Sequence, residues 1–498
     1  MRLLRDRIHL QPDGVLTLTG AGPVMLHGGA IREMVETLLS DGIDAARGDS
    51  TASFRELIDF LETAGLTGLA DETLAPAPAR SGHVLLAGDA DWVSPLAEEL
   101  VSCGIAHLSV WAPVAGRDAG RDAPNRGDPP LSPDLDLVVG AFAPRRPVLQ
   151  VELEQSCRRA GIPFLGAEII GAKGFAGPVS RAGLAGCWLC ARQRRRAHAP
   201  DPTAWARADG LARVHHSRPG PEVSRSFARS LSAEICRHLA ADAAGALEGK
   251  IRILDLAAQT SSLHGFIPMP FCSTCGKDPV ATQCRSAGPC TGPRQRFRDW
   301  LDLETGVFVG PVLRDRPRPL PGTFIAVAEV APFCGFRDDP IAAEPACGKG
   351  LTEDEAMISA IGEAFERYAA SRCDPRTLVR ARMRDLDGPV LDPRQIGLYG
   401  RSQYAEPDFP FRPFDPEAQA FWTTAVNPCS GARTWVLAEQ VYYRLPAGYS
   451  NHLQQMTSNG LAAGADQQSA AMRAILEVIE RDAVLTAWLR RDAGRLLP

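Results

Sequence analysis

The chain has 498 residues, of which 54 are Lys or Arg and 59 are Asp or Glu, so its formal net charge is -5. A hydrophobic fraction of 45% and a charged fraction of 23% are ordinary for globular proteins and exclude a chain that is mainly disordered or fibrous. The slightly acidic balance argues against nucleic acid as the main partner, and the length predicts about three domains.

The sequence carries no sign of export or of membrane insertion. No apolar run approaches the roughly 20 residues that a membrane span needs, and the first 14 residues carry charges where a signal peptide has its apolar stretch. Thirteen cysteines in such a chain are expected to be reduced or metal-bound. We therefore expect a cytoplasmic protein that contacts no membrane.

Residues 1–74 predict a small unit of two strands followed by two helices. Leu16 and Leu18 alternate with threonines, as in a half-buried strand, and apolar residues at helical spacing follow from Ile31 to Leu38. A second helix is expected after Ser53, which begins a capping-box pattern. A proline-rich stretch at 75–79 predicts a stiff linker to the next domain.

Residues 82–290 form the second predicted domain, and it opens like a doubly wound nucleotide-binding fold. Segments 83–88 and 105–111 have the character of strands, and the helix between them is predicted to start at Ser94. A phosphate-binding turn needs glycines so that backbone amides can approach a pyrophosphate. Asp89 and Asp91 occupy this turn and would repel a phosphate, so we expect no ATP in this domain.

Two CxxC pairs separated by a long insertion follow in the same domain. They consist of Cys187, Cys190, Cys272 and Cys275. Four thiolates at this spacing predict a closed, structural zinc site, and the second pair disfavours a redox role for the first. Four arginines follow the first pair, at positions 192 and 194–196. We expect them to form a solvated face, with contact to an acidic peptide as the alternative.

These features together resemble the ThiF-like region of azoline-forming cyclodehydratases, enzymes that modify ribosomally made peptides. Gly177-Pro178 ahead of Gly186-Cys187 fits the approach to the first cysteine pair in that family. The resemblance implies that residues 1–74 are a winged-helix-like clamp that captures a leader peptide as an added strand. It also implies that the second domain binds leader peptide without adenylating it. For residues 1–74 alone, a small α+β packing module is the alternative.

From about residue 294 two phrases echo each other. GKGL at 348–351 precedes SAIGEAFER at 359–367, and SNGLAAG at 458–464 precedes ILEVIERD at 475–482. In each of the two repeated phrases, two glutamates lie three residues apart and share a helix face. The pairs are Glu363 with Glu366 and Glu477 with Glu480.

The second pair stands among apolar residues, which predicts a buried helix. Ionised carboxylates there need a cation or dense hydrogen bonds, and the two pairs predict oxygen ligands for magnesium. Structural pairing with the arginine that follows each pair is the alternative.

The two phrases resemble the YcaO domain, whose members bind ATP through magnesium-holding glutamates. The resemblance places these residues at ATP or magnesium positions: Ser359, Glu363, Glu366, Glu477, Glu480 and Arg481. The family usually has Asn and Glu where this chain has Ala465 and Ser469, which predicts weaker metal binding. Only 204 residues follow Arg294, so we expect 294–498 to be the N-terminal part of a YcaO domain, truncated at its C-terminus.

The expected fold class is therefore a multidomain α/β chain: a winged-helix-like clamp, a degenerate ThiF-like α/β domain with structural zinc, and a partial α+β YcaO domain. The resemblance implies ATP-dependent cyclodehydration of Cys, Ser or Thr in a precursor peptide to azolines, with ATP, Mg²⁺ and Zn²⁺ as cofactors. The implied partners are a precursor peptide with an N-terminal leader, a separate azoline dehydrogenase and a second copy in a homodimer.

Two alternatives stay open at this point. One is a non-catalytic leader-peptide-binding protein with a degenerate or truncated YcaO part. The other is an adenylating enzyme, which Asp89 and Asp91 disfavour. No catalytic residue is assigned by the sequence.

Overall fold

The fold is that of a computed structural model of the chain. It describes residues 2–3, 8–11, 14–19, 22–27, 29–41, 57, 67–68, 82–112, 128–142, 147–170, 173–198, 220–240, 247–256, 260–276, 297, 300–313, 322–331, 344–396, 398–427, 430–446 and 448–492. The chain forms two compact units. Unit 1 comprises Met1–Gly310, Ala331–Cys334 and Pro340–Ala342, and unit 2 comprises Pro311–Val330, Gly335–Asp339 and Ala343–Pro498.

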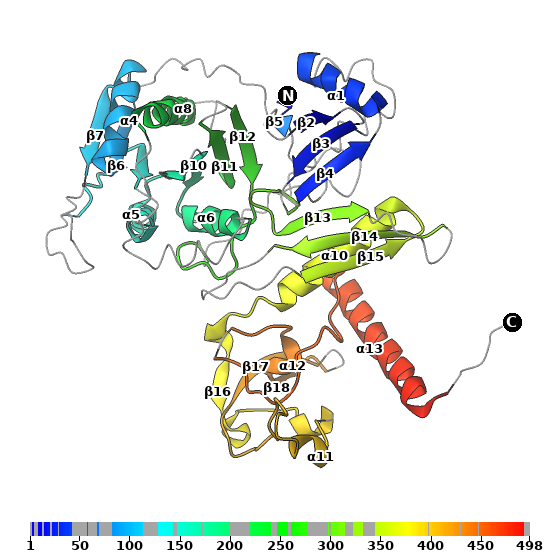
Figure 1. The fold of residues 1–498 in the computed structure, drawn as a ribbon. Coiled ribbons are helices and arrows are strands. Elements are labelled where there is room, and N and C mark those ends of the chain that lie inside the picture. Colours follow the sequence, from blue (N-terminus) through cyan, green and yellow to red (C-terminus); the bar gives the residue numbers. More distant parts are fainter. Residues whose placement is uncertain are drawn as a thin grey trace. The chain divides into compact units, whose positions relative to one another are not determined.

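The N-terminal part of unit 1 is a three-stranded antiparallel meander with a helix (Figure 1). Its elements are β2 (Ile8–Gln11), β3 (Gly14–Thr19), β4 (Gly22–His27) and α1 (Gly29–Asp41), and a separate short pair joins β1 (Arg2–Leu3) to β5 (Thr67–Gly68). The prediction of two strands is wrong, because segments on both sides of β3 pair with it. In α1, Val35 and Leu38 are buried, as their spacing predicts. The helix predicted after Ser53 lies outside the described residues, apart from the buried Leu57.

The second part of unit 1 is built on a seven-stranded mixed sheet in the order β12-β11-β10-β9-β8-β6-β7. The strands are β6 (His83–Gly88), β7 (His107–Trp111), β8 (Leu137–Ala141), β9 (Phe164–Ile170), β10 (Lys173–Ser180), β11 (Lys250–Asp255) and β12 (Thr260–Gly265). Strands β6 to β9 run parallel, which confirms the doubly wound opening, and β10 to β12 continue antiparallel.

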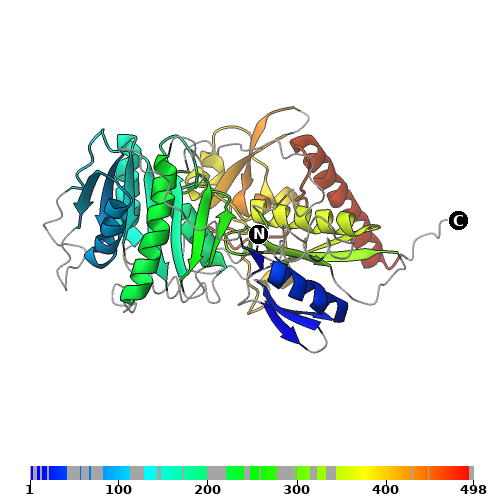
Figure 2. The same cartoon turned by 90° about the horizontal axis from the view of Figure 1, so that it is seen from above.

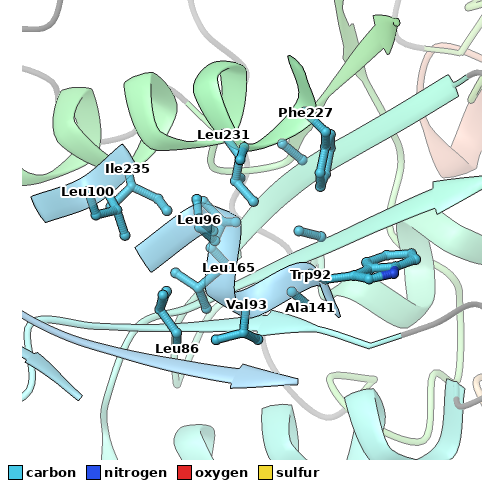
Figure 3. Close-up of a cluster of buried hydrophobic side chains, with 14 of the residues drawn as sticks. Leu86, Trp92, Val93, Leu96, Leu100, Ala141, Leu165, Phe227, Leu231 and Ile235 are labelled. Carbon is cyan, nitrogen blue, oxygen red and sulfur yellow. The ribbon is translucent and has the colours of Figure 1, made fainter. Parts of the chain in front are cut away.

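Helices cover both faces of this sheet. They are α4 (Ala90–Ser102), α8 (Pro221–Leu239), α5 (Pro147–Ala160) and α6 (Trp188–Ala197). Figure 2 shows α4 and α8 side by side on one face, where Leu96 and Leu231 belong to the core drawn in Figure 3. On the other face, Leu153 of α5 and Trp188 of α6 pack into a second core.

Helix α4 begins at Ala90, four residues before the predicted start at Ser94. The N–H groups of Trp92 and Val93 both donate to the carbonyl oxygen of Asp89, so the first turn forms directly after β6. Pro95 consequently lies inside the helix, where it removes one backbone hydrogen bond.

Unit 2 begins with a three-stranded sheet on which a long helix packs. The elements are β13 (Phe308–Leu313), whose last residues belong to unit 2, β14 (Phe324–Val330), β15 (Glu344–Gly350) and α10 (Glu353–Ala370). Thr352 begins α10 through a capping box with Glu355. Small residues allow close packing of α10, because a Cβ atom at Gly348 would lie 2.1 Å from the Ala360 nitrogen.

A second three-stranded sheet follows in unit 2. It contains β16 (Val379–Ala381), β17 (Ala420–Val426) and β18 (Arg433–Leu437), with the short helices α11 (Arg401–Tyr404), α12 (Ala438–Val441), η2 (Pro375–Thr377), η3 (Met383–Asp385) and η4 (Pro393–Ile396). Trp422 and Leu437 form the centre of its core.

The last described element is α13 (Gln467–Arg490), which Asp466 caps by accepting the Ser469 N–H at 2.7 Å. No residue of α13 is buried, and Ile475 to Ile479 expose large apolar side chains. The prediction of a buried helix is wrong, because an apolar sequence is buried only where other residues cover it. No helix among the described residues is long and apolar enough to cross a membrane.

Candidate functional site

The four predicted cysteines of unit 1 come together. Cys187 and Cys190 lie at the start of α6, and Cys272 and Cys275 lie in the segment after β12. The Sγ atoms of Cys187 and Cys272 are 3.5 Å apart, as are those of Cys190 and Cys275. All four sulfur atoms lie within 4.8 Å of one another. A tetrahedral zinc with Zn–S bonds of about 2.3 Å places its sulfur atoms about 3.8 Å apart, so the tetrad fits this ion.

Backbone donors surround the tetrad. The N–H of Gly186 donates to Cys275 at 3.3 Å, and the N–H of Met269 donates to Cys190 at 3.2 Å. Such donors stabilise thiolates, which are the ligands that zinc requires.

The arginines that follow Cys190 are buried, so the prediction of a solvated face is wrong. The exposed fractions are 2% for Arg192, 2% for Arg194, 6% for Arg195 and 6% for Arg196. Arg192 and Arg195 form ion pairs with the buried Glu168 of β9, and the Arg195 guanidinium lies 3.8 Å from the centre of the Phe175 ring. Burial is possible because these cations meet a buried carboxylate and an aromatic face.

In unit 2, Glu363 of α10 connects its helix to β15. Its Oε2 atom accepts the Cys347 N–H at 2.9 Å, and its Oε1 atom accepts a hydrogen bond of 2.6 Å from Arg367. The carboxylate therefore satisfies a backbone donor of β15 and pairs with the cation one helical turn later.

Glu477 of α13 repeats this arrangement. Its Oε2 atom accepts the Gly460 N–H at 3.0 Å, and its Oε1 atom lies 3.2 Å from the guanidinium of Arg481. The two echoing phrases thus share a structure as well as a pattern. In both, the first glutamate accepts a backbone N–H from the segment that precedes its helix, at Cys347 or at Gly460, and pairs with an arginine four residues later.

Glu366 brings the two helices into electrostatic contact. Burial, together with the charges of Glu477 and Glu363, raises the pKa of this carboxyl to about 7. Carboxylates from α10 and α13 therefore share one electrostatic environment, as a cation site requires.

The remaining predicted residues are exposed to solvent. Ser359 is exposed one turn before Glu363, and Glu480 and Arg481 are exposed on α13. Within the described part of the chain, the cysteine tetrad is the group of three or more ligand residues whose atoms converge. The carboxylates of Glu363, Glu366, Glu477 and Glu480 therefore do not form such a group among the described residues.

Sequence reasoning missed the buried Glu439 of α12. It accepts hydrogen bonds from the Ser450 hydroxyl at 2.6 Å and from the N–H groups of His452 at 2.7 Å and Leu453 at 3.2 Å. This carboxylate fixes the segment that leads to the second phrase. Its surroundings in sequence gave no indication of burial, because its partners lie more than ten residues away.

Comparison with known proteins identifies the C-terminal part of the chain. Residues 347–498 match the family model described as YcaO cyclodehydratase, ATP- and Mg²⁺-binding. This part of the chain is therefore similar to the YcaO family. The matched range includes all six predicted ATP and magnesium residues and begins at Cys347, whose N–H binds Glu363.

The fold of the whole chain resembles two solved heterocyclases. One was solved in complex with substrate and cofactor. It matches this chain with a TM-score of 0.60 and 20% sequence identity, and the match covers 98% of this chain and 71% of the heterocyclase chain. The other is the heterocyclase TruD, with a TM-score of 0.55 and 18% sequence identity. This match covers 98% of this chain and 70% of the TruD chain. These two matches show that the chain shares the heterocyclase fold, and the YcaO match supports the predicted resemblance of residues 347–498.

A curated relative shares part of the sequence. It is an uncharacterized protein of Methanothermobacter thermautotrophicus, 35% identical over 150 residues. The match takes in 30% of this chain, and the chain spans about a third of that relative, 34% of its length.

Proposed function

We propose that this chain is an ATP-dependent cyclodehydratase that converts Cys, Ser or Thr residues of a ribosomally made precursor peptide into azolines. In this reaction the side chain adds to the preceding amide carbonyl, and the carbonyl oxygen accepts the γ-phosphoryl group of ATP. Loss of phosphate then leaves the azoline, and ADP is released. The observation that supports the proposal best is the repeated glutamate–arginine arrangement on α10 and α13 within the YcaO match.

The roles of the YcaO residues follow from their chemistry. Glu363, Glu366, Glu477 and Glu480 would supply oxygen ligands to Mg²⁺, and Ser359 and Arg481 would contact ATP. Magnesium at these carboxylates would neutralise charge on the transferred phosphoryl group. Arg367 and Arg481 hold Glu363 and Glu477 in place until the ion and nucleotide bind.

Unit 1 is proposed to hold the leader peptide. We assign residues 1–74 to a winged-helix-like clamp, 82–290 to a degenerate ThiF-like domain and 294–498 to the YcaO part. The meander β2–β4 offers sheet edges to which a leader could add as a strand. Zinc at Cys187, Cys190, Cys272 and Cys275 would tie two distant segments of the second domain together.

The remaining partners belong to the same proposal. The precursor peptide carries an N-terminal leader, a separate azoline dehydrogenase oxidises the product, and two chains form a homodimer in the cytoplasm. The dehydrogenase is not needed to test the ring-forming step.

A non-catalytic leader-binding protein is the second candidate. The exposed Glu480 and the replacement of two family residues by Ala465 and Ser469 favour it, because both reduce the ligands available to magnesium. Peptide binding without chemistry would then be the function of the chain.

One assay separates the two candidates. The full chain is incubated with Mg²⁺-ATP and a leader-bearing peptide that contains Cys, and water loss is followed by mass spectrometry. We expect one water lost per ring and ADP formed in step. Glu363→Ala should abolish both, whereas Glu353→Ala, an exposed glutamate on the same helix, should leave them unchanged. Peptide binding with no water loss in the unmodified chain would favour the second candidate.

A further inference from the structure

A serine, a histidine and an aspartate are joined by hydrogen bonds at one edge of the seven-stranded sheet. The Nδ1 atom of His83, the first residue of β6, lies 2.8 Å from the Asp134 carboxylate. The Nε2 atom of the same ring lies 3.1 Å from the hydroxyl oxygen of Ser109 in β7. His83 and Ser109 are partly buried and Asp134 is exposed, so solvent and small molecules can reach the group.

The positions of the protons in this group follow from the chemistry of its members. Hydrogen bonds from Ser132 and from His83 lower the pKa of Asp134, so its carboxylate is ionised near neutral pH and can only accept. The Nδ1 atom of His83 therefore carries a proton, and in the neutral ring Nε2 is left as an acceptor for the Ser109 hydroxyl. A serine hydroxyl that donates to an imidazole held by a carboxylate is activated as a nucleophile.

Backbone hydrogen bonds hold these segments in place. The His83 N–H donates to the Asp136 carboxylate at 2.8 Å, and the Asp136 N–H donates to the His83 carbonyl oxygen at 2.9 Å. Strand β7 pairs in parallel with β6, with Ser109 opposite Leu85. Two adjacent strands and the segment before β8 therefore set the distances among the three side chains.

Strand β7 also supplies hydrogen-bond donors beside Ser109. It is the outer strand of the sheet (Figure 1), and no other described strand pairs with its outer edge. Every second N–H group of an edge strand points away from the sheet, so at least one such group lies at Ser109 or at a residue next to it. These N–H groups can donate to a carbonyl oxygen that gains negative charge during a reaction.

The surroundings of Ser109 indicate the class of substrate. Trp111 lies two residues later on the same face of β7, and it packs against the core, as does Leu131. Asp134 and Asp136 bring negative charge to the rim of the group. A small, uncharged acyl group suits such surroundings, whereas an acidic one is repelled.

We propose that Ser109 and His83 form a catalytic site that hydrolyses esters of small uncharged acyl groups, with Asp134 as its positioning residue. The Ser109 Oγ atom attacks the ester carbonyl carbon, and its proton passes to Nε2 of His83. The bond between this carbon and the alcohol oxygen then breaks, and the alcohol leaves with that proton.

Water completes the reaction. It attacks the acyl carbon and gives a proton to Nε2 of His83, the bond to the Ser109 oxygen breaks, and Ser109 takes the proton back. In total, one ester and one water give one carboxylic acid and one alcohol. The site shares no residue with the proposed ATP, magnesium or zinc sites, so the outcome of its test is independent of the proposed cyclodehydratase activity.

The first test is labelling of the full-length chain, purified in the presence of zinc, with a fluorophosphonate probe that reacts with activated serines. We expect mass spectrometry to find the phosphonyl group on Ser109. Ser109→Ala should remove this label, and His83→Ala should slow its formation by about 100-fold, because the general base is lost. The matched controls are Ser102→Ala and His107→Ala, which change an exposed serine and an exposed histidine nearby and should label at the wild-type rate.

The second test is steady-state hydrolysis of p-nitrophenyl acetate by variants whose melting temperature equals that of the wild type. Ser109→Ala should abolish the turnover. Asp134→Ala should lower kcat by about tenfold or more and leave KM unchanged, because Asp134 holds the imidazole and does not contact the ester. The proposal is overturned if the wild-type chain takes no label at Ser109, or if Ser109→Ala hydrolyses the acetate as fast as the wild type.

Discussion

Glu366 is the residue in unit 2 whose charge is most sensitive to its surroundings. Its pKa is raised to about 7 by burial first and by Glu477 and Glu363 next. The three carboxylates repel one another, and this repulsion is relieved either by a proton on Glu366 or by a divalent cation. At the proposed magnesium site, a proton and Mg²⁺ would therefore compete for the same carboxylates.

From this competition we expect Mg²⁺-ATP to bind about tenfold more weakly at pH 6 than at pH 8, because about nine in ten Glu366 side chains are protonated one pH unit below a pKa of about 7. Isothermal titration calorimetry at both pH values measures the ratio. Glu366→Gln should bind weakly at both, and Glu353→Gln should behave as the wild type. Equal wild-type affinities at pH 6 and pH 8 would contradict the role given to Glu366.

Glu154 of α5 is a buried carboxyl in unit 1 whose pKa is also raised. Burial raises its pKa to about 7 from an ordinary value of 4.5, although it accepts the Trp188 N–H at 3.0 Å. The folded chain therefore binds a proton here between pH 4.5 and 7 that the unfolded chain has released. The free energy of unfolding consequently falls as the pH rises from 4.5 to 7, and it stays lower above pH 7.

We expect Glu154→Gln to remove this loss, since the amide keeps an oxygen acceptor for Trp188 without the charge. Its stability relative to the wild type should rise by about 2.5 kcal/mol between pH 5 and pH 8. Urea denaturation at the two pH values gives the difference, with the exposed Glu152→Gln as control. A constant difference across this range would show that the carboxyl titrates normally.

At the scale of elements, the contact between α10 and β15 places Glu363 beside the Cys347 N–H. Gly348 and Gly350 bring the strand close to the helix, because Cβ atoms there would lie 2.1 Å and 2.4 Å from atoms of α10. Gly362, by contrast, lies within α10 with open space around its Cβ position. The two kinds of glycine have opposite physical roles.

Gly348→Ala should therefore destabilise unit 2 by about 3 kcal/mol, since the clash is with backbone atoms that cannot rotate away. Gly362→Ala should stabilise it by about 0.5 to 1 kcal/mol, because alanine restricts the unfolded chain and favours a helix. Hydrogen exchange of α10 amides measures both changes. Equal effects of the two variants would refute the close approach of β15.

Helix α13 has an apolar sequence, but no other described residues bury it. Trp488 and Leu489 each expose 79% of their surface, and seven further large apolar side chains of the helix are also exposed. Surfaces of this kind promote association. We expect Trp488→Arg with Leu489→Arg to reduce self-association, measured by light scattering against protein concentration. Scattering unchanged from the wild type would show that α13 does not mediate association.

At the scale of the whole molecule, the metal and the nucleotide are assigned to different units. The cysteine tetrad lies in unit 1, and Glu363, Glu366 and Glu477 lie in unit 2. Loss of zinc should therefore affect the two units unequally, because the tetrad joins segments of unit 1 that are more than 80 residues apart.

We expect elemental analysis to find zinc in the wild type and none in Cys272→Ser, and we expect this variant to lower the melting temperature of unit 1 by about 10 °C or more. Hydrogen exchange should rise in β9 to β11 and stay unchanged in α10. Cys347→Ser, an exposed cysteine outside the tetrad, should keep both zinc and melting temperature. A wild-type chain that carries no zinc would refute the assignment.

The sequence by itself determined what depends on short spacing: the two CxxC pairs, the parallel opening of the large sheet, the helical position of Val35 and Leu38, and the two echoing phrases. Residues three or four apart on a helix have a fixed relation, so these features follow from local geometry. The tertiary structure decided the burial of Arg192 and Arg195 against Glu168, the exposure of α13, the third strand of the N-terminal meander and the hydrogen bonds of Glu363 and Glu477 to backbone N–H groups. Each of these depends on which distant residues cover or face a side chain. Burial and charge pairing depend on residues that are distant in sequence and meet only in the folded chain. Local spacing carries no information about which residues meet.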